Sequence, residues 1–251
     1  MRQFPRQSVS VLCLVFFGVL AIGCAGRERS AFPKNFRVGV AETDITPPVG
    51  YRMAGYFEER RSTGIHDPLM AKAMVFQHGS EVIALAFCDL VGVSLSVSKE
   101  ARQCASLKTG IPVKNILVAA THSHTGPLFN DPRAKYFHQV ALEKFGSDSQ
   151  EQIDYPGFLE EKLIEVICQA QSRLKPAQLA VGVAKQEGLA FNCRFHMMNG
   201  TVAFNPGQLN PNIVRPARPT DPDVGMLLVR DAKQKLRAGL TVFAMHADTV
   251  G

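Results

Sequence analysis

The sequence predicts an α/β protein whose mixed, largely antiparallel β-sheets pack together with helices on the outside. Three observations support this class. Apolar segments of strand length outnumber helical ones, several are joined by turn signals typical of hairpins, and one long segment has amphipathic helical spacing. The length of 251 residues and the hydrophobic content of 46% are ordinary for a globular chain of one large or two small domains.

The first half of the chain predicts four strands and one helix. Residues 36–50 predict a strand that runs into a Pro-Pro turn, and residues 71–90 predict two strands joined by a His-Gly-Ser turn. Residues 94–108 have helical residue types and are followed by a Gly-Ile-Pro stop signal. Residues 115–120, NILVAA, are apolar after the first position, which predicts a buried strand.

The second half predicts a core-packing helix followed by further hairpins. Residues 156–174 place apolar side chains at helical spacing in front of a polar back face. Residues 178–186 predict a strand, and an Asn-Gly pair between the strand-like arms of residues 194–207 predicts a hairpin. Residues 224–246 predict two strands around a polar turn. The proline-rich residues 205–223 predict an irregular surface loop or a lid.

The N-terminus predicts export. Residues 1–24 combine a basic start with an apolar run too short for a comfortable transmembrane helix, and they end in Gly23-Cys24. This pattern is typical of a bacterial lipoprotein signal peptide with lipid on Cys24; an ordinary signal peptide cut nearby or an uncleaved anchor are the alternatives. Residues 25–35 are a tether, and residues 36–251 form the domain. We expect a membrane-anchored lipoprotein, periplasmic or on the cell surface, or else a secreted protein.

The four cysteines outside the predicted signal segment do not predict a cysteine zinc site. None forms a C-x-x-C pair, and an exported protein is permitted to form disulfides without any clear signal for one here. Two of the cysteines lie in apolar runs and are predicted to be buried thiols, namely Cys88 and Cys168. The cysteines of the domain are Cys88, Cys104, Cys168 and Cys193.

Charge and known motifs exclude several function classes. The 28 Lys and Arg against 22 Asp and Glu give a net charge of +6 that no basic run concentrates, so we expect no nucleic-acid partner. The sequence also contains no G-x-S-x-G, no H-E-x-x-H, no P-loop and no G-x-G-x-x-G after a strand.

The most informative segment is residues 118–127, VAATHSHTGP, in which an apolar strand is followed by His122 and His124. Residues i and i+2 of a strand point to the same side, so the two imidazoles are predicted to converge. Two neutral imidazoles suit zinc. Asp89, at the end of a neighbouring apolar strand, is positioned to bind the metal or to orient a histidine. The alternative is a pair of hydrogen-bonded loop histidines, because H-x-H alone is a weak motif.

His246 strengthens the metal interpretation. The segment LTVFAMHADT, residues 240–249, again places a histidine after an apolar strand. Two separate strands that deliver histidines at their ends are what a metal site assembled across a sheet needs. We therefore predict that the side chains of His122, His124 and His246 converge. A histidine hydrogen-bonded at the end of its strand remains the alternative for His246.

Four segments together resemble a known family. GVAETDITPPVGYRMAGY, GIHDPLMAKAMVF, AATHSHTGP and FAMHADT occur in the order typical of the N-terminal catalytic domain of neutral/alkaline non-lysosomal ceramidases. The resemblance covers residues 36–251, and T-H-x-H-[ST]-G-P is its most specific part. It implies a zinc-dependent amidase that hydrolyses the N-acyl bond of ceramide to sphingosine and fatty acid. A ceramide-like lipid substrate follows from it, and the lipid anchor predicted at Cys24 would place the chain near such acyl-chain substrates.

The resemblance also implies roles for individual residues. It implies that His122 and His246 are zinc ligands and that His124 is the neighbouring catalytic histidine, which contacts the substrate or the water on the metal. Arg194, in the segment FNCRF, is implied to help shape the catalytic site. Three further residues fall in matching segments as possible supporting residues, with turn capping and local hydrogen bonding as equal alternatives: Asp44, His66 and Asp89.

One departure from the family limits these expectations. The resemblance implies that a Glu and a Tyr downstream of the second histidine complete the zinc shell, and that the active-site serine also lies downstream, whereas Gly251 follows His246 by five residues. We therefore expect this chain to be an incomplete catalytic domain with little activity, and Asp89 is the first candidate for a local third ligand. The alternatives are a hydrolase of another N-acylated or ester substrate, and a non-catalytic surface lipoprotein.

Overall fold

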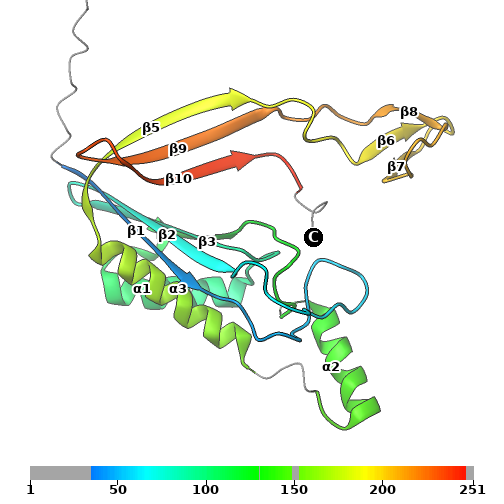
Figure 1. The fold of residues 1–251 in the computed structure, drawn as a ribbon, viewed down its shortest axis with the longest axis horizontal. Helices are drawn as coiled ribbons and strands as arrows, with labels where there is room; N and C mark the ends of the chain where they lie inside the picture. The colour runs from blue at the N-terminus through cyan, green and yellow to red at the C-terminus, as the bar shows by residue number, and fades with distance from the viewer. Residues whose placement is uncertain (1–34, 130, 149–152, 247–251) are drawn as a thin grey trace, which may run out of the picture. The chain divides into compact units, whose positions relative to one another are not determined.

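The structure is a computed structural model that describes residues 35–129, 131–148 and 153–246 (Figure 1). The predicted signal segment and all but the last residue of the predicted tether lie outside these residues. The strands are β1 (Phe36–Asp44), β2 (Met70–His78), β3 (Glu81–Cys88), β4 (Ile116–Ala120), β5 (Lys175–Lys185), β6 (Arg194–Met197), β7 (Val202–Phe204), β8 (Ile213–Pro216), β9 (Asp223–Asp231) and β10 (Leu236–Phe243). The helices are α1 (Leu95–Thr109), α2 (Pro132–Phe145) and α3 (Tyr155–Ser172), with a short 3-10 helix, η1 (Val113–Asn115). No helix among the described residues is long and apolar enough to cross a membrane.

The described residues form two sheets. A seven-stranded sheet has the order β10-β9-β5-β1-β2-β3-β4, and a three-stranded sheet has the order β7-β6-β8. Within the described residues the strand pairings are antiparallel, except that β3 and β4 are parallel and are connected through α1. A parallel pair needs such a crossover connection. The predicted class, a mixed and largely antiparallel α/β fold, is confirmed.

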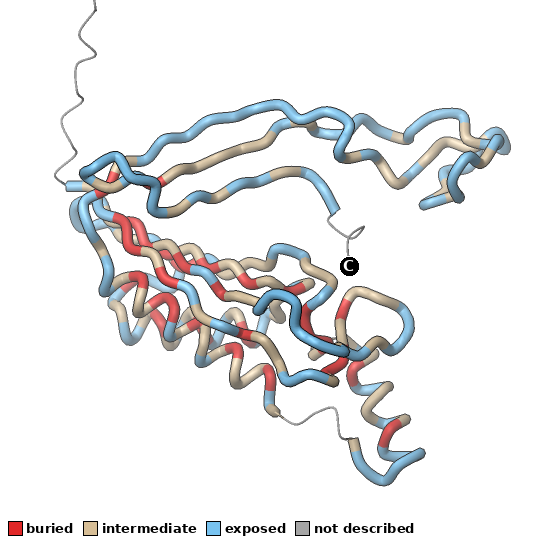
Figure 2. The backbone as a smooth tube through the Cα atoms, viewed as in Figure 1, coloured by how far each residue is buried: buried red, intermediate tan, exposed pale blue. Residues whose placement is uncertain are grey.

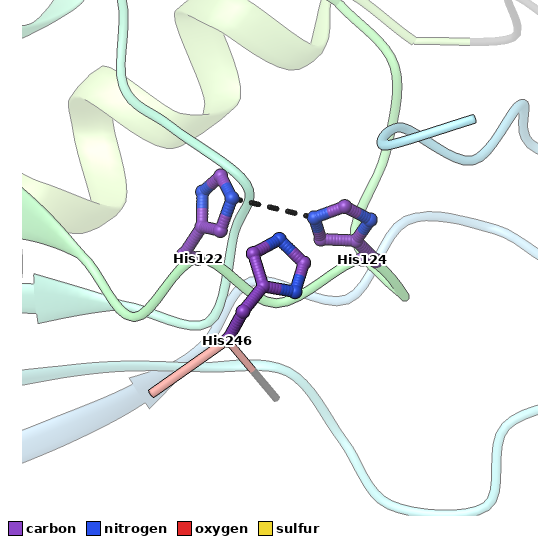
Figure 3. A group of neighbouring side chains, drawn as sticks. All are labelled: His122, His124 and His246. Carbon is purple, nitrogen blue, oxygen red and sulfur yellow. Dashed lines mark hydrogen bonds between the residues drawn. The ribbon is translucent and has the colours of Figure 1, made fainter. Parts of the chain in front are cut away.

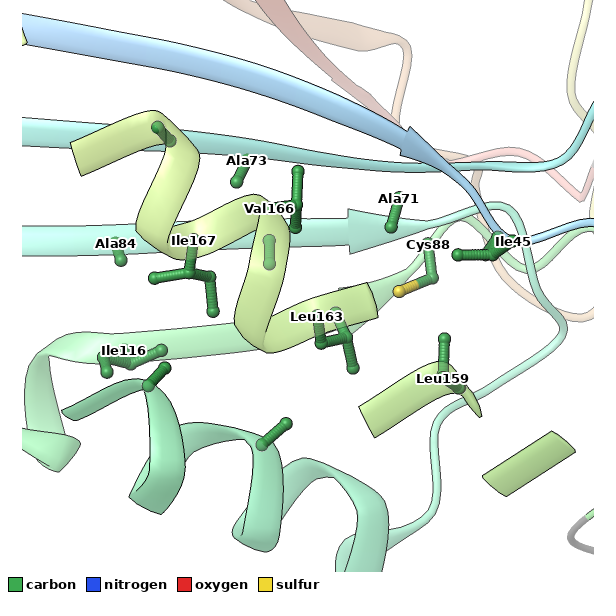
Figure 4. Packing of buried hydrophobic residues seen from close by; sticks show 14 of the residues in the cluster. Ile45, Ala71, Ala73, Ala84, Cys88, Ile116, Leu159, Leu163, Val166 and Ile167 are labelled. Carbon is green, nitrogen blue, oxygen red and sulfur yellow. The ribbon is translucent and has the colours of Figure 1, made fainter. Parts of the chain in front are cut away.

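Helices α1 and α3 cover one face of β1 to β4, and the main core lies between the two helices and this face of the sheet (Figures 2 and 4). Helix α1 begins at the N-cap Ser94, whose side chain accepts a hydrogen bond from the backbone N–H of Val97, and ends at Gly110 in the left-handed conformation. The amphipathic spacing of residues 156–174 forms α3 as predicted. The buried side chains of α3 are Tyr155, Leu159, Leu163, Val166, Ile167 and Ala170.

A close approach between β1 and α3 depends on Gly39. A Cβ atom added there would lie 1.8 Å from the carbonyl oxygen of Ala170, a backbone atom. Only a residue without a side chain lets the helix lie this close to the strand. The β1 to β4 region with α1 and α3 is called the helical layer below.

Strands β5, β9 and β10 form the other part of the large sheet, called the arm below. The arm joins the helical layer through two register pairs between β1 and β5, Arg37 with Pro176 and Val38 with Lys175. A second, small buried cluster supports this joint. Its members are Val38, Phe76, Ala177 and Val229. Beyond the joint most residues of β5 and β10 are exposed (Figure 2).

Three predictions about local structure differ from the structure, and one helix was not predicted. The NILVAA strand forms as β4, but of its residues only Ile116 is buried, because β4 is an edge strand. The loop of residues 205–223 contains the short edge strand β8, which tolerates Pro216 at its end. Cys168 is half-buried rather than buried, although Cys88 is buried as predicted. Helix α2 was not predicted, although Asp131 caps it and a proline occupies its first turn.

Candidate metal centre

Two loops that follow the parallel strands β3 and β4 lie side by side. The backbone N–H of Thr121 donates to the carbonyl of Cys88 at 2.9 Å, and that of Ser123 donates to the carbonyl of Leu90 at 3.0 Å. These bonds extend the strand pairing past the end of β3. They fix the backbone from which His122 and His124 project.

The predicted reason for the convergence of His122 and His124 was wrong. Strand β4 ends at Ala120, so neither histidine lies in a strand. His122 instead has a φ of 64°, in the left-handed region that few non-glycine residues adopt, although histidine is among the more tolerant. This turn, rather than strand alternation, brings the two ring centroids to 4.9 Å. Such a backbone persists only where its surroundings hold it, and it often marks a functional site.

The protonation of His122 follows from its hydrogen bond. Its Nδ1 lies 2.8 Å from the carbonyl oxygen of Val91. A carbonyl can only accept, so Nδ1 carries the proton and donates it. The lone pair of Nε2 is then available to bind a metal, and a carbonyl that orients a histidine in this way is typical of metal sites.

His246 completes a cluster of three imidazoles (Figure 3). It follows β10, and its ring centroid lies 4.9 Å from that of His122 and 4.7 Å from that of His124. One ligand atom from each of the three residues lies within 4.8 Å of the others. The predicted convergence of the three histidines is confirmed.

The three side chains fit a zinc ion by their chemistry. Imidazole nitrogen is a preferred zinc ligand, and catalytic zinc sites combine three protein ligands with an open position. Nε2 of His122 and Nε2 of His124 are 3.4 Å apart, which suits either a hydrogen bond between the rings or two nitrogens on one ion. His122 and His246 are exposed and His124 is half-buried, so the cluster is accessible from solvent.

Asp89 directly follows β3 and Asp44 is the last residue of β1, as the sequence predicted. Both carboxylates accept hydrogen bonds that support the local backbone. The carboxylate of Asp89 accepts from the backbone N–H of Met70 at 3.0 Å and from the hydroxyl of Thr121 at 3.3 Å. Asp89 thus ties the start of β2 to the loop that carries His122. Asp44 accepts from the backbone N–H of Thr46 at 2.7 Å, as a turn cap does.

His66 and Arg194 have neighbours outside the histidine cluster. The imidazole of His66 is almost fully exposed and lies 2.7 Å from the carboxylate of Asp67. Arg194 is on β6, where its guanidinium lies 5.6 Å from the ring centroid of Phe204 and its backbone N–H donates to the side chain of Asn192. The described contacts of these two residues therefore do not include the three histidines.

Sequence reasoning missed several residues that surround the cluster. The backbone carbonyl of Val91 could not be identified from the sequence, because every residue type has such a carbonyl. Gly55 and Tyr56 belong to the segment GVAETDITPPVGYRMAGY, which was noted only for the family resemblance. In the structure Tyr56 lies edge-on to His124, with ring centroids 5.7 Å apart. Nothing in that segment by itself indicated that the glycine and the tyrosine meet His124.

The thiol of Cys88 lies one residue before Asp89 but is not a candidate ligand. Burial, and to a lesser extent the charge of Asp89, raises the pKa of Cys88 to about 12. Because the thiolate is the form that binds metals, Cys88 acts as a small core side chain. The four cysteines in the described part of the chain are free thiols.

A large cavity among the described residues does not coincide with the histidines. It has a volume of about 670 Å³ and lies at the joint between the helical layer and the arm, where Val38, Met74 and Val229 line it. None of the three histidines lines it. The candidate site is therefore identified by its ligand atoms and hydrogen bonds and not by a cavity.

Comparison with known proteins agrees with these features. The profile of the family described as neutral/alkaline non-lysosomal ceramidase, N-terminal, matches residues 36–250. The neutral ceramidase of Pseudomonas aeruginosa is 24% identical over 221 residues, which are 86% of this chain and 30% of the relative.

Solved structures show a similar fold. A crystal structure of neutral ceramidase from Pseudomonas aeruginosa has a TM-score of 0.58 at 22% identity and covers 83% of this chain. A ceramidase complexed with C2 has a TM-score of 0.60 at 24% identity over the same share. The chain spans about a third of the length of these relatives, 30% of the curated sequence and 31% of each solved chain.

Proposed function

Because the chain belongs to the neutral/alkaline non-lysosomal ceramidase family, we propose that it functions as a zinc-dependent amidase, which hydrolyses the N-acyl bond of ceramide to sphingosine and fatty acid. The observation that carries the zinc assignment is the hydrogen bond from His122 Nδ1 to the carbonyl of Val91. It leaves Nε2 of His122 available in a cluster in which one ligand atom from each of His122, His124 and His246 lies within 4.8 Å of the others. Family membership supports the substrate and the reaction.

The three histidines have distinct proposed roles. His122 and His246 hold the zinc, and His124 contacts the reacting amide, where its imidazole can donate a hydrogen bond to the developing oxyanion or transfer a proton to the leaving amine. A bound zinc ion supplies Lewis-acid polarisation of the carbonyl and lowers the pKa of a water. The carbonyl of Val91 holds the ring of His122 in the tautomer that metal binding requires.

Metal content of purified variants tests the ligand assignment. We expect His122→Ala and His246→Ala to lose zinc, because each removes a ligand, and His124→Ala to retain it. His78→Ala is the matched control, since His78 lies at the exposed end of β2, away from the cluster. Loss of zinc from His124→Ala would make His124 a third ligand. Full zinc retention by all variants would remove the cluster as the metal site.

Hydrolysis assays test the substrate. Short-chain ceramide, other N-acyl amides and esters are offered to the purified chain with and without a chelator. We expect any turnover that this chain shows to be chelator-sensitive and to favour ceramide over the other substrates. Faster cleavage of another amide or an ester would support a different hydrolase on the same scaffold. Zinc binding without turnover of any substrate would support a non-catalytic protein.

The proposed location follows from the N-terminal sequence. Residues 1–24 lie outside the described residues, so their role stays a prediction: Cys24 receives lipid and anchors the exported chain to a bacterial membrane, near acyl-chain substrates. In a bacterial host we expect incorporation of labelled fatty acid and recovery in the membrane fraction. The substitution Cys24→Ser is expected to abolish both. Unchanged labelling of Cys24→Ser would contradict the assignment.

A further inference from the structure

The ring of His124 packs directly against the backbone of Gly55. Gly55 has a φ of +98°, in the region that favours glycine, and a Cβ added there would lie 2.3 Å from Nδ1 and 2.5 Å from Cγ of His124. Any side chain at this position must displace either the imidazole or the Gly55 backbone. The absence of a side chain therefore creates the space that His124 occupies.

Backbone hydrogen bonds connect the residues just before Gly55 to the segment that follows His124. The N–H of Ala54 donates to the carbonyl of Gly126 at 2.9 Å, and the N–H of Leu128 donates to the carbonyl of Arg52 at 2.7 Å. The guanidinium of Arg52 is buried and forms an ion pair with the carboxylate of Asp148 at 2.6 Å. Because these bonds tie the residues just before Gly55 to the segment that follows His124, a new side chain at Gly55 is expected to move the imidazole.

Tyr56 closes a second side of His124. Its ring meets the imidazole edge-on at 89°, with centroids 5.7 Å apart. The guanidinium of Arg60 lies 3.7 Å above the centroid of the Tyr56 ring, and Arg133 donates a hydrogen bond to the Tyr56 carbonyl. Cation–π contact and hydrogen bonding thus hold both the ring and the backbone of Tyr56.

We propose that Gly55 and Tyr56 are positioning residues that hold the imidazole of His124 against His122 and His246. Gly55 provides the space and Tyr56 limits rotation of the ring. The consequence for catalysis rests on the proposed function, in which His124 acts at the reacting amide. The position of the imidazole itself does not depend on that function and is measurable in the metal-free chain.

The test compares two glycine substitutions in the purified full chain. Gly207 has a φ of +95°, but a Cβ added there would have no atom within 4 Å, so Gly207→Ala shares the backbone strain of Gly55→Ala without the contact. The readout is the imidazole carbon–proton NMR signals of His124 in the metal-free chain, assigned by their loss in His124→Gln. We expect Gly55→Ala to shift these signals and Gly207→Ala to leave them in place. Unshifted signals in a folded Gly55→Ala would overturn the proposal.

A second pair of variants decides the matter if Gly55→Ala does not fold. Tyr56→Leu removes the aromatic edge, whereas Tyr56→Phe retains the ring. We expect the His124 signals to broaden in Tyr56→Leu, because an unsupported ring exchanges between orientations, and to stay sharp in Tyr56→Phe. Equal line widths in the two variants contradict the proposed role of Tyr56.

Turnover separates this inference from the proposed function. If the wild-type chain hydrolyses ceramide, we expect Gly55→Ala to retain zinc and to lose about 100-fold in kcat, since a misplacement of about 1 Å has this effect, with Gly207→Ala near wild type. If the wild-type chain does not hydrolyse ceramide, the proposed function fails for this chain. The NMR comparison still supports or overturns the positioning of His124.

Discussion

In the helical layer α1 and α3 bury one face of the sheet, whereas in the arm most side chains of β5 and β10 are in contact with solvent (Figure 2). Both regions are rich in valine and leucine, so residue type alone does not decide burial. Val166 of α3 has no exposed surface, while Val181 of β5 is 77% exposed. The helical layer is stabilised by its core, and the arm mainly by the hydrogen bonds between its strands.

The candidate site takes residues from both regions. His122 and His124 follow β4 of the helical layer, whereas His246 follows β10 of the arm. Their separation is therefore only as constant as the joint between β1 and β5, which contains two register pairs and a small buried cluster. Substitutions that act on one region, or on the joint, distinguish stability from site geometry.

The largest expected effect is truncation of the main core. Leu163 on α3 is fully buried, so Leu163→Ala is expected to lower the free energy of unfolding by about 4 kcal/mol, through lost burial and a cavity. Val181→Ala in the arm removes an exposed side chain and is expected to change it by less than about 0.5 kcal/mol. Urea denaturation followed by circular dichroism measures both. Similar losses in the two variants would mean that the arm is buried in solution.

A second pair of glycine substitutions tests close packing instead of cavity formation. Gly39→Ala places a Cβ against the carbonyl oxygen of Ala170 and is expected to destabilise the protein by about 3 kcal/mol. Gly182 lies in β5 with no atom within 4 Å of its Cβ position, so Gly182→Ala is expected to stay within about 0.5 kcal/mol of wild type. The measurement is again urea denaturation. A well-tolerated Gly39→Ala would show that α3 moves away from β1 without loss.

The contrast between the regions also explains what the sequence could predict. The hairpins, the helix over residues 156–174 and the overall class follow from local turn signals and hydrophobic periodicity, and these were right. The exposure of β4 and β5 was not predictable, because burial depends on which elements cover a strand. Helix α2 was missed although its signals are present, an aspartate cap, a proline in the first turn and a glycine at the end.

The site was predictable as a set of residues but not as a geometry. Histidines that follow apolar strands indicated that His122, His124 and His246 meet. The left-handed turn at His122 and the Val91 carbonyl that orients it arise from tertiary contacts, which no local pattern encodes. The space at Gly55 depends likewise on a loop 69 positions earlier than His124, so it becomes visible only in three dimensions.

The joint between the regions gives an intermediate effect. Val229 of β9 is buried in the small cluster with Val38 and Phe76, and Val229→Ala is expected to destabilise the protein by about 2 kcal/mol. Hydrogen exchange is expected to accelerate in β5, β9 and β10 more than in α3, because the arm loses its support. Val242→Ala, at a 65% exposed position of β10, is the control. Uniform acceleration across both regions would indicate a single cooperative unit.

The smallest expected effect concerns the start of α2, where the N-cap Asp131 and Arg133 of the first turn form an ion pair. Hydrogen bonds from the side chain of Arg133 lower the pKa of the Asp131 carboxyl from its ordinary 3.8 to about 2. A lowered pKa stabilises the folded state above the unfolded pKa, and this contribution is lost as the pH falls from about 4 to about 2. Because the pair is partly exposed and screened by solvent, we expect it to contribute less than about 1 kcal/mol to the free energy of unfolding.

The variant Asp131→Asn retains an N-cap acceptor but not the charge. The difference in unfolding free energy between wild type and Asp131→Asn should therefore shrink over that pH range, as measured by urea denaturation. A difference that stays constant down to pH 2 would show that the ion pair with Arg133 does not stabilise the start of α2.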